Sequence, residues 1–196
     1  MVLDLLLAGE CPGCGAVGAE PCAACVAAMD RSPPVPVPAS LDRCRALLAY
    51  EGPAREVVAR LKYRNRRATL GWLATGIARL VPAGEVDVVT WAPTSAERRR
   101  QRGYDQAELL ARRVARRTGL PCRSLLRREP GPPQTGRDLA ARARGPSFAA
   151  RCALGGCRVA IVDDVVTTGA TLDAAGRALR AAGAGWLMGL AAAHPR

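Results

Sequence analysis

The stretch that decides the fold of this chain is residues 159–171, Val159-Ala-Ile-Val-Asp163-Asp164-Val-Val-Thr167-Thr168-Gly169-Ala-Thr171. Four consecutive apolar residues predict a strand buried on both faces, which is typical of parallel sheets. Two carboxylates follow the strand, and hydroxyl side chains with a glycine then open an expected helix over 170–182. The stretch therefore predicts a strand–turn–helix unit whose turn concentrates the polar chemistry.

The two halves of this turn suit different chemical groups. Backbone amides at a helix start bind phosphate, the threonine hydroxyls can add donors, and Gly169 lets the backbone come close to a ligand. Asp163 and Asp164 would repel phosphate, but carboxylates accept hydrogen bonds from a vicinal diol and bind a hard cation such as Mg²⁺. A phosphate beside a diol describes a ribose 5-phosphate.

The rest of the chain alternates between short apolar runs and helical spacing. Strands are expected over 45–50, 86–91, 158–162 and 186–191, with a further one at 122–126, and helices over 53–63, 67–80, 106–118 and 170–182. This alternation predicts the α/β class, with a mainly parallel sheet flanked by helices. Ligands then bind beyond the carboxyl ends of the strands, here after Trp91, Leu126 and Val162.

Length and composition bound the possible functions. With 196 residues, 49% of them hydrophobic, the chain can form one domain with a core of normal size and a small appendage. The only histidine is His194, which excludes a Ser-His-Asp hydrolase and an HExxH protease. The only lysine, Lys62, follows Leu61 rather than a glycine, so no Walker-type nucleotide site is present.

Positive charge is concentrated in parts of the chain. The net charge is +12, and the stretches 55–67, 98–117 and 123–151 hold 21 basic residues against five acidic ones. Such clustering predicts an anion-binding face. The alternative is an arginine-rich composition on solvated helix faces.

Four cysteines near the N-terminus form two closely spaced pairs, Cys11-x-x-Cys14 and Cys22-x-x-Cys25. Each pair can present two thiolates from one tight turn, so we expect a structural zinc site with four thiolate ligands. A site that has lost its metal, or redox-active pairs, is the alternative. Thiols used in this way indicate a reducing, cytoplasmic location. The apolar run over 1–8 is too short to cross a membrane, and no membrane insertion is expected.

These features divide the chain into three parts. Residues 1–30 are the expected zinc-finger module, and residues 31–40 are a proline-rich spacer. The spacer is expected to be either extended and semi-rigid or packed as a loop on the body. Residues 41–196 form the α/β domain.

Residues 159–171 resemble the signature by which type I phosphoribosyltransferases bind phosphoribosyl pyrophosphate (PRPP). Further stretches are similar to the ComF family of phosphoribosyltransferase-like proteins. They comprise Leu61-Lys62-Tyr63, a proline after the second strand at Pro93, the basic run Arg98–Arg102 followed by Gly103-Tyr104-Asp105-Gln106, and Gln134-Thr135-Gly136 with Arg142. Asp105 replaces the usual Asn of the family pattern. The four-cysteine finger also belongs to that pattern, so the resemblance extends over nearly the whole chain.

The resemblance implies a type I phosphoribosyltransferase fold, a PRPP ligand with Mg²⁺, and a link to DNA uptake in natural competence. It assigns catalytic roles to Arg102, Asp163 and Asp164, and a flexible loop to Gln134 and Arg142. PRPP would be held by Thr94, Ser95, Asp163, Asp164, Thr167, Thr168, Gly169, Ala170 and Thr171. Purine phosphoribosyltransferases often carry an acid at the position of Thr167 as a general base. Threonine cannot act in that way, so the acceptor substrate stays open.

Three functions remain open at this point. The chain could be an active phosphoribosyltransferase, or an accessory protein of DNA uptake that binds single-stranded DNA and other competence proteins, with a regulatory or vestigial PRPP site. It could also be a regulator that senses PRPP. Aromatic residues make up only 4% of the chain, so any nucleic-acid binding is expected to be salt-sensitive and weakly sequence-specific.

Overall fold

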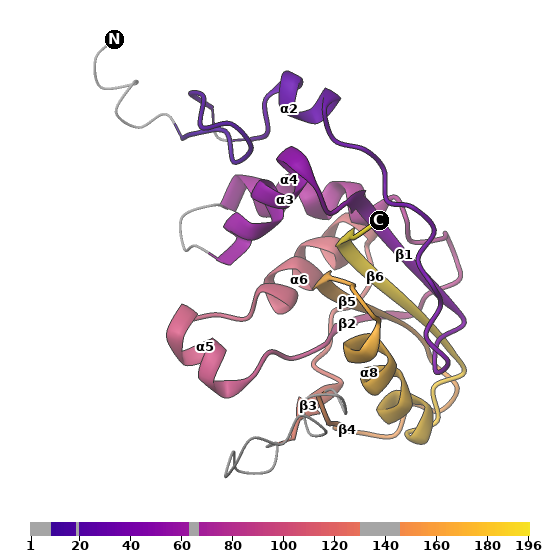
Figure 1. The fold of residues 1–196 in the computed structure, drawn as a ribbon. Coiled ribbons are helices and arrows are strands. Elements are labelled where there is room, and N and C mark those ends of the chain that lie inside the picture. The colour runs from indigo at the N-terminus through magenta and orange to yellow at the C-terminus, as the bar shows by residue number, and fades with distance from the viewer. Residues whose placement is uncertain (1–8, 19, 63–66, 130–145) are drawn as a thin grey trace.

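A computed structural model describes residues 9–18, 20–62, 67–129 and 146–196 (Figure 1). The main sheet has four parallel strands in the order β1-β6-β5-β2. They are β1 (Arg43–Ala49), β2 (Val88–Trp91), β5 (Arg158–Val165) and β6 (Trp186–His194). The expected α/β fold with a parallel sheet is confirmed.

Helices cover both faces of the sheet (Figure 1). One face packs against α3 (Gly52–Ala59), α4 (Arg67–Ala78) and α6 (Gln106–Thr118), and the other against α8 (Ala170–Ala181). A short 3₁₀ turn, Arg60–Lys62, extends α3. Because apolar side chains line both faces, Val159 to Val162 at the centre of the sheet are fully buried. Within the described residues, no helix is long and apolar enough to cross a membrane.

The strand expected at 122–126 is wrong in position. Cys122 makes one isolated bridge to Val89, and the strand itself is β3 (Leu126–Arg128). This strand pairs antiparallel with β4 (Phe148–Ala150) in a separate two-stranded sheet. The carboxyl edge of the parallel sheet therefore does not include Leu126.

A helix that apolar spacing did not indicate follows β2. This is α5 (Ala96–Arg102), which has no buried residue and projects to the side of the sheet (Figure 1). Ser95 caps its start, and Gly103 ends it in the left-handed conformation. The basic run of the sequence is thus an exposed helix beside the carboxyl end of β2.

The proline-rich segment 31–40 lies against the body. Ser32 donates a backbone hydrogen bond to the Leu47 carbonyl, and Ser40 bonds to Asp173 of α8 through its amide and its hydroxyl. Pro38 packs directly over Gly169. Of the two conformations expected for this segment, the structure shows the packed one.

The four-cysteine module consists of a turn and a one-turn helix. Glu10 and Val17 bridge across the turn that carries Cys11 and Cys14. The helix is α2 (Ala23–Ala27), with Cys22 as its N-cap and Cys25 within it. This arrangement brings the two cysteine pairs together although seven residues separate them in the sequence.

Candidate functional site

A hollow that opens to the surface lies at the carboxyl ends of β2 and β5, with an empty volume of about 620 Å³ when the open space at its mouth is included. Its wall includes Thr94 and Arg102 from the segment after β2, Asp163 and Asp164 from β5, and Thr171 from α8. These residues come from segments far apart in the sequence. They meet because parallel strands place their carboxyl ends at one edge of a sheet.

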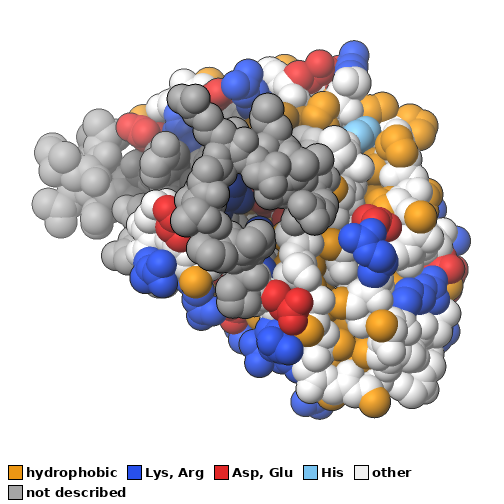
Figure 2. Space-filling view, turned by 60° about the horizontal axis from the view of Figure 1, so that its bottom comes forward, with side chains coloured by type: hydrophobic (Ala, Val, Ile, Leu, Met, Phe, Trp, Pro, Cys, Tyr) orange, Lys and Arg blue, Asp and Glu red, His pale blue; other side chains and the backbone are white. Residues whose placement is uncertain are grey.

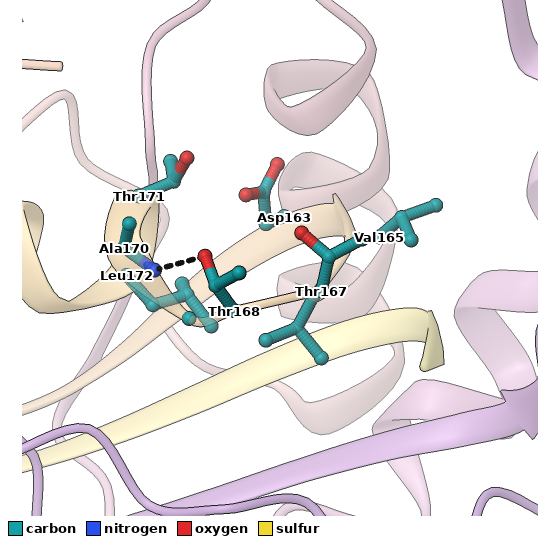
Figure 3. A pocket seen from close by; sticks show the side chains of 9 residues that line it. Asp163, Val165, Thr167, Thr168, Ala170, Thr171 and Leu172 are labelled. Carbon is teal, nitrogen blue, oxygen red and sulfur yellow. Dashed lines mark hydrogen bonds between the residues drawn. The ribbon is translucent and has the colours of Figure 1, made fainter. Parts of the chain in front are cut away.

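A smaller pocket continues from this hollow along the turn between β5 and α8 (Figure 3). Residues 165–172 line it together with Asp163. Gly169 at the start of α8 has a φ of 76°, a conformation that other residues adopt only at a cost. The hydroxyl of Thr168 accepts a hydrogen bond from the Ala170 amide at 3.4 Å, the bond drawn in Figure 3.

Several backbone amides of this turn are available to a ligand. Among the residues that the structure describes, the amides of Thr167, Thr168 and Gly169 donate no hydrogen bond. The side chains of Thr167 and Thr168 are exposed, and Thr171 is half-buried. Successive amides at the start of a 12-residue helix form a concave donor surface that suits a phosphate.

The two aspartates occupy the end of β5. This strand runs three residues further than expected, so that Asp163 and Asp164 belong to the strand and not to the following turn. Each carboxylate accepts a hydrogen bond from the next backbone amide, Asp163 from Asp164 at 2.9 Å and Asp164 from Val165 at 2.8 Å. Burial, together with the neighbouring charge of Asp164, raises the pKa of Asp163 well above its ordinary value.

In Figure 3 the side chains of Asp163 and Thr171 lie on the same side of the turn. Both also line the larger hollow. The carboxylates thus stand between the amide-rich turn on one side and the loop after β2 on the other. This placement suits a ligand that has an anionic group at each end and hydroxyl groups in its middle.

The loop after β2 is held by Asp105. This carboxylate is buried and accepts hydrogen bonds from the amides of Thr94 at 2.8 Å, Ala107 at 3.0 Å and Glu108 at 3.3 Å. Burial raises the pKa of Asp105, whereas these three amides act to lower it. The residue that replaces the usual Asn of the resembled motif therefore caps α6 and fixes Thr94 at the same time.

Ser95 has a different role from its neighbour Thr94. Its hydroxyl accepts the Arg98 amide at 3.2 Å and caps α5. Ser95 is not among the residues that line the hollow. The structure thus brings Thr94 to the hollow and uses Ser95 to position the basic helix beside it.

Arg102 is fixed at the wall of the hollow by Gln106. The Arg102 Nη1 donates to the Gln106 Oε1 at 2.8 Å. Because arginine has only donors, this bond defines which end of the Gln106 amide faces Arg102. The Gln106 Nε2 is buried and has no partner within the described residues.

Sequence reasoning missed two arginines of the hollow, Arg98 from α5 and Arg128 from β3. Arg128 is half-buried, and burial lowers its pKa, as does the nearby charge of Arg98. No sequence pattern singled out Arg128, which is one of seven arginines in the stretch 123–151. Only the antiparallel pairing of β3 with β4 brings it to the hollow.

Other residues singled out by the sequence lie outside the described part of the chain. These are Gln134 and Arg142 of the expected flexible loop and Tyr63 of the Leu-Lys-Tyr element. The same holds for the side chain of Lys62. Of the expected ligand-binding residues, Thr94, Asp163, Asp164 and Thr171 meet at the hollow, while Thr167, Thr168, Gly169 and Ala170 line the smaller pocket.

The four cysteines form a second site, away from the hollow. Their sulfur atoms all lie within 4.8 Å of one another, with 3.7 Å between the Sγ atoms of Cys14 and Cys22. Four thiolates at the usual zinc–sulfur distance of about 2.3 Å stand roughly 3.8 Å apart, so the cluster fits a tetrahedral zinc ion. The backbone amides of Cys14 and Cys22 lower the pKa of the Cys11 thiol to about 6, whereas burial raises the pKa of Cys25 to about 12, so the fit to zinc rests on the sulfur geometry.

No model of a known protein family matches the chain, and no curated protein matches it. Several solved structures do match part of the chain. A purine phosphoribosyltransferase from Pyrococcus horikoshii Ot3 is 17% identical over 63% of this chain and 72% of its own, with a TM-score of 0.42. Glutamine PRPP amidotransferase from B. subtilis, complexed with ADP and GMP, is 24% identical over 69% of this chain, with a TM-score of 0.47.

An allosteric regulatory enzyme of purine biosynthesis gives the same values of 24% identity, 69% coverage and a TM-score of 0.47. This chain spans only 30% of the length of that enzyme and of the amidotransferase. The similarity therefore concerns the fold of one part of those larger proteins. The α/β fold of this chain is established by its own parallel sheet and flanking helices.

Proposed function

We propose that this chain is a cytoplasmic, PRPP-binding protein of the phosphoribosyltransferase type, similar to the ComF proteins and linked to DNA uptake. The observation that carries the proposal is the hollow that joins Thr94, Arg102, Asp163, Asp164 and Thr171 from three separate segments. The amide-rich turn 167–171 would hold the 5-phosphate. The two carboxylates would accept hydrogen bonds from the ribose hydroxyls.

Arg102 would face the diphosphate of the ligand. Glycosyl transfer breaks the bond between the ribose C1 atom and the diphosphate, so positive charge develops at C1 while negative charge develops on the leaving group. A guanidinium group fixed in advance by Gln106 stabilises that negative charge without having to reorganise. Asp163 and Asp164, held on β5, keep the ribose ring oriented while the bond breaks.

Mg²⁺ fits this site as a partner of the ligand. Within the described residues, the only group of three or more cysteine, histidine or acidic side chains close enough to hold a metal is the cysteine cluster. Asp163 and Asp164 would therefore share the ion with oxygen atoms of the ligand, as is usual for Mg²⁺. The ion would supply additional neutralisation of the diphosphate charge.

The experiment that tests this function measures PRPP-dependent release of pyrophosphate in the presence of Mg²⁺ and a panel of nucleobases and amines. We expect release with at least one acceptor, and loss of release in the double variant Asp163→Ala/Asp164→Ala. If the protein binds PRPP but releases pyrophosphate with none of the acceptors, the result would favour a PRPP-sensing regulator over an enzyme. Absence of PRPP binding would refute both the enzyme and the sensor.

A second candidate is binding of single-stranded DNA, favoured by helix α5. Arg98, Arg99 and Arg100 are exposed on this helix. The helix projects from the side of the sheet (Figure 1). On the face shown in Figure 2, however, basic side chains stand interspersed with acidic ones rather than in one continuous stripe. We therefore expect DNA binding to depend on α5 and to weaken steeply with salt.

The test of this second candidate is the fluorescence anisotropy of a labelled oligo-dT strand at increasing salt. The variant Arg99→Ser/Arg100→Ser should bind the strand more weakly and show a smaller salt slope than the unmodified protein. Equal affinity and equal slope for the two proteins would exclude α5 as the binding surface.

A further inference from the structure

The strongest feature that the proposed function leaves unused is Arg128. It lies on β3 opposite Phe148 of β4, and its guanidinium carbon stands 5.7 Å from the centre of the Phe148 ring. Its Nη1 donates to the Pro93 carbonyl at 3.3 Å. A stacked ring on one side and a backbone carbonyl on the other fix the guanidinium in one place.

No acid pairs directly with Arg128, although the more distant charges of Asp163 and Asp105 favour its cation. Within the described part of the chain, Arg128 has no ion-pair partner, and its one hydrogen bond goes to a neutral carbonyl. It is half-buried and stands near Arg98, another cation. Burial and the charge of Arg98 together disfavour the cation more than these two acids favour it, so an anion bound in the hollow would offset a cost that the protein alone does not.

Arg128 lines the hollow and has N–H donors that its bond to Pro93 does not use. Arginine carries five N–H groups in a planar fork that matches two oxygens of a phosphate group, and only one of them is used by Pro93. Arg98 and Arg102 line the same wall, so three arginines from two segments surround one space. The amide-rich turn that suits a single phosphate lies on the other side of the aspartates.

We propose that Arg128 is a fixed anion-binding side chain of this hollow and determines its preference for a diphosphate over a single phosphate. The proposal rests on the proposed function in assigning the hollow to the diphosphate end of the ligand. It adds a residue from a further segment of the chain, and it ties the small β3–β4 sheet to ligand recognition. Because Phe148 and Pro93 hold the fork in advance, little side-chain entropy is lost on binding.

The adjacent residue Arg127 provides a matched control. It lies on the same strand, but its side chain is 56% exposed and pairs with Glu129 at 3.6 Å. Neighbouring residues of a strand point to opposite faces, so Arg127 does not line the hollow. Arg127→Gln and Arg128→Gln therefore remove the same charge from the same strand.

The experiment compares three probes by calorimetry with Mg²⁺, namely inorganic pyrophosphate, ribose 5-phosphate and PRPP. Arg128→Gln should lose about ten- to a hundredfold in affinity for pyrophosphate and for PRPP, the range expected for charged hydrogen bonds. Its affinity for ribose 5-phosphate should stay within about twofold of the unmodified protein, and Arg127→Gln should match the unmodified protein for all three probes. Arg128→Lys keeps the charge but lacks the planar fork of donors. Its affinity for pyrophosphate and for PRPP should lie between that of Arg128→Gln and that of the unmodified protein.

Thermal melting checks that each variant is folded. If Arg128→Gln does not fold, the binding of Arg128→Lys decides the outcome. Unchanged pyrophosphate binding in the folded Arg128 variant, an equal loss for ribose 5-phosphate, or an equal loss in Arg127→Gln would overturn the proposal. If the unmodified protein binds pyrophosphate but not PRPP, the proposed function fails while the Arg128 comparison still stands. If it binds neither, both fail.

Discussion

Gly169 offers a quantitative test of how the amide-rich turn 167–171 is built. Its φ of 76° lies in the left-handed region, which costs a residue with a side chain about 1–2 kcal/mol. A Cβ placed there would also stand 2.9 Å from the Cγ of Pro38, closer than real Cβ contacts. Gly169→Ala should therefore incur the conformational cost plus roughly 1–3 kcal/mol for the overlap, the usual range for overpacking.

Gly119 isolates the conformational part of this cost. It has a φ of 72° at the end of α6, and a Cβ there would meet nothing within 4 Å. Gly119→Ala should cost about 1–2 kcal/mol, which corresponds to a fall in Tm of roughly 2–8 °C for a chain of this size. Gly169→Ala should lower Tm by several degrees more.

The assay is thermal unfolding of the two single variants and of the double variant Pro38→Ala/Gly169→Ala. Pro38→Ala removes the Cγ atom and should recover the extra loss, since contacting residues show non-additive effects. Gly169→Ala should also weaken phosphate binding, because the shifted turn no longer presents its amides as before. Equal losses of Tm in Gly169→Ala and Gly119→Ala would refute the packing of Pro38 on the turn.

Two further predictions concern charge and metal. Burial raises the pKa of Asp163, so native Asp163 keeps its proton at pH values where the unfolded chain has already released it, and the contribution of this group to stability falls as pH rises above about 4. Melting curves should accordingly show Asp163→Asn more stable than wild type at pH 7 and without this advantage near pH 3.5; no gain at pH 7 would contradict the burial of this carboxyl group. The unmodified chain should hold one equivalent of zinc, and metal analysis of Cys22→Ser/Cys25→Ser should find none, whereas retained zinc would exclude the cysteine cluster as its ligand set.

The sequence predicts the central sheet well because β2, β5 and β6 have runs of residues that are buried on both faces. Val159 to Val162 form a continuous apolar run, and the helix after Gly169 begins where the glycine and threonines indicate. The position of Asp163 and Asp164 at the carboxyl end of β5 follows from that run alone. What it does not indicate is that β5 continues through Val165, which places both carboxylates inside the strand.

Helix α5 and the β3–β4 sheet could not be predicted in the same way. Helix α5 buries no residue, so it has no apolar periodicity, and only the cap Ser95 and the terminal Gly103 indicate it. Strands β3 and β4 have three residues each, and the ladder that joins Arg128 to Phe148 spans a long stretch of sequence. Pairing at that separation depends on the tertiary fold, so the sequence does not indicate that Arg128 lies at the hollow.

The measurement that tests the central claim most directly is calorimetry of PRPP binding in the presence of Mg²⁺. The hollow and the amide-rich turn 167–171 predict one PRPP-binding site per chain. The double variant Asp163→Ala/Asp164→Ala should lose this binding while it stays folded. A protein that binds no PRPP, or a double variant that binds it as tightly as the unmodified chain, would contradict the assignment of this site.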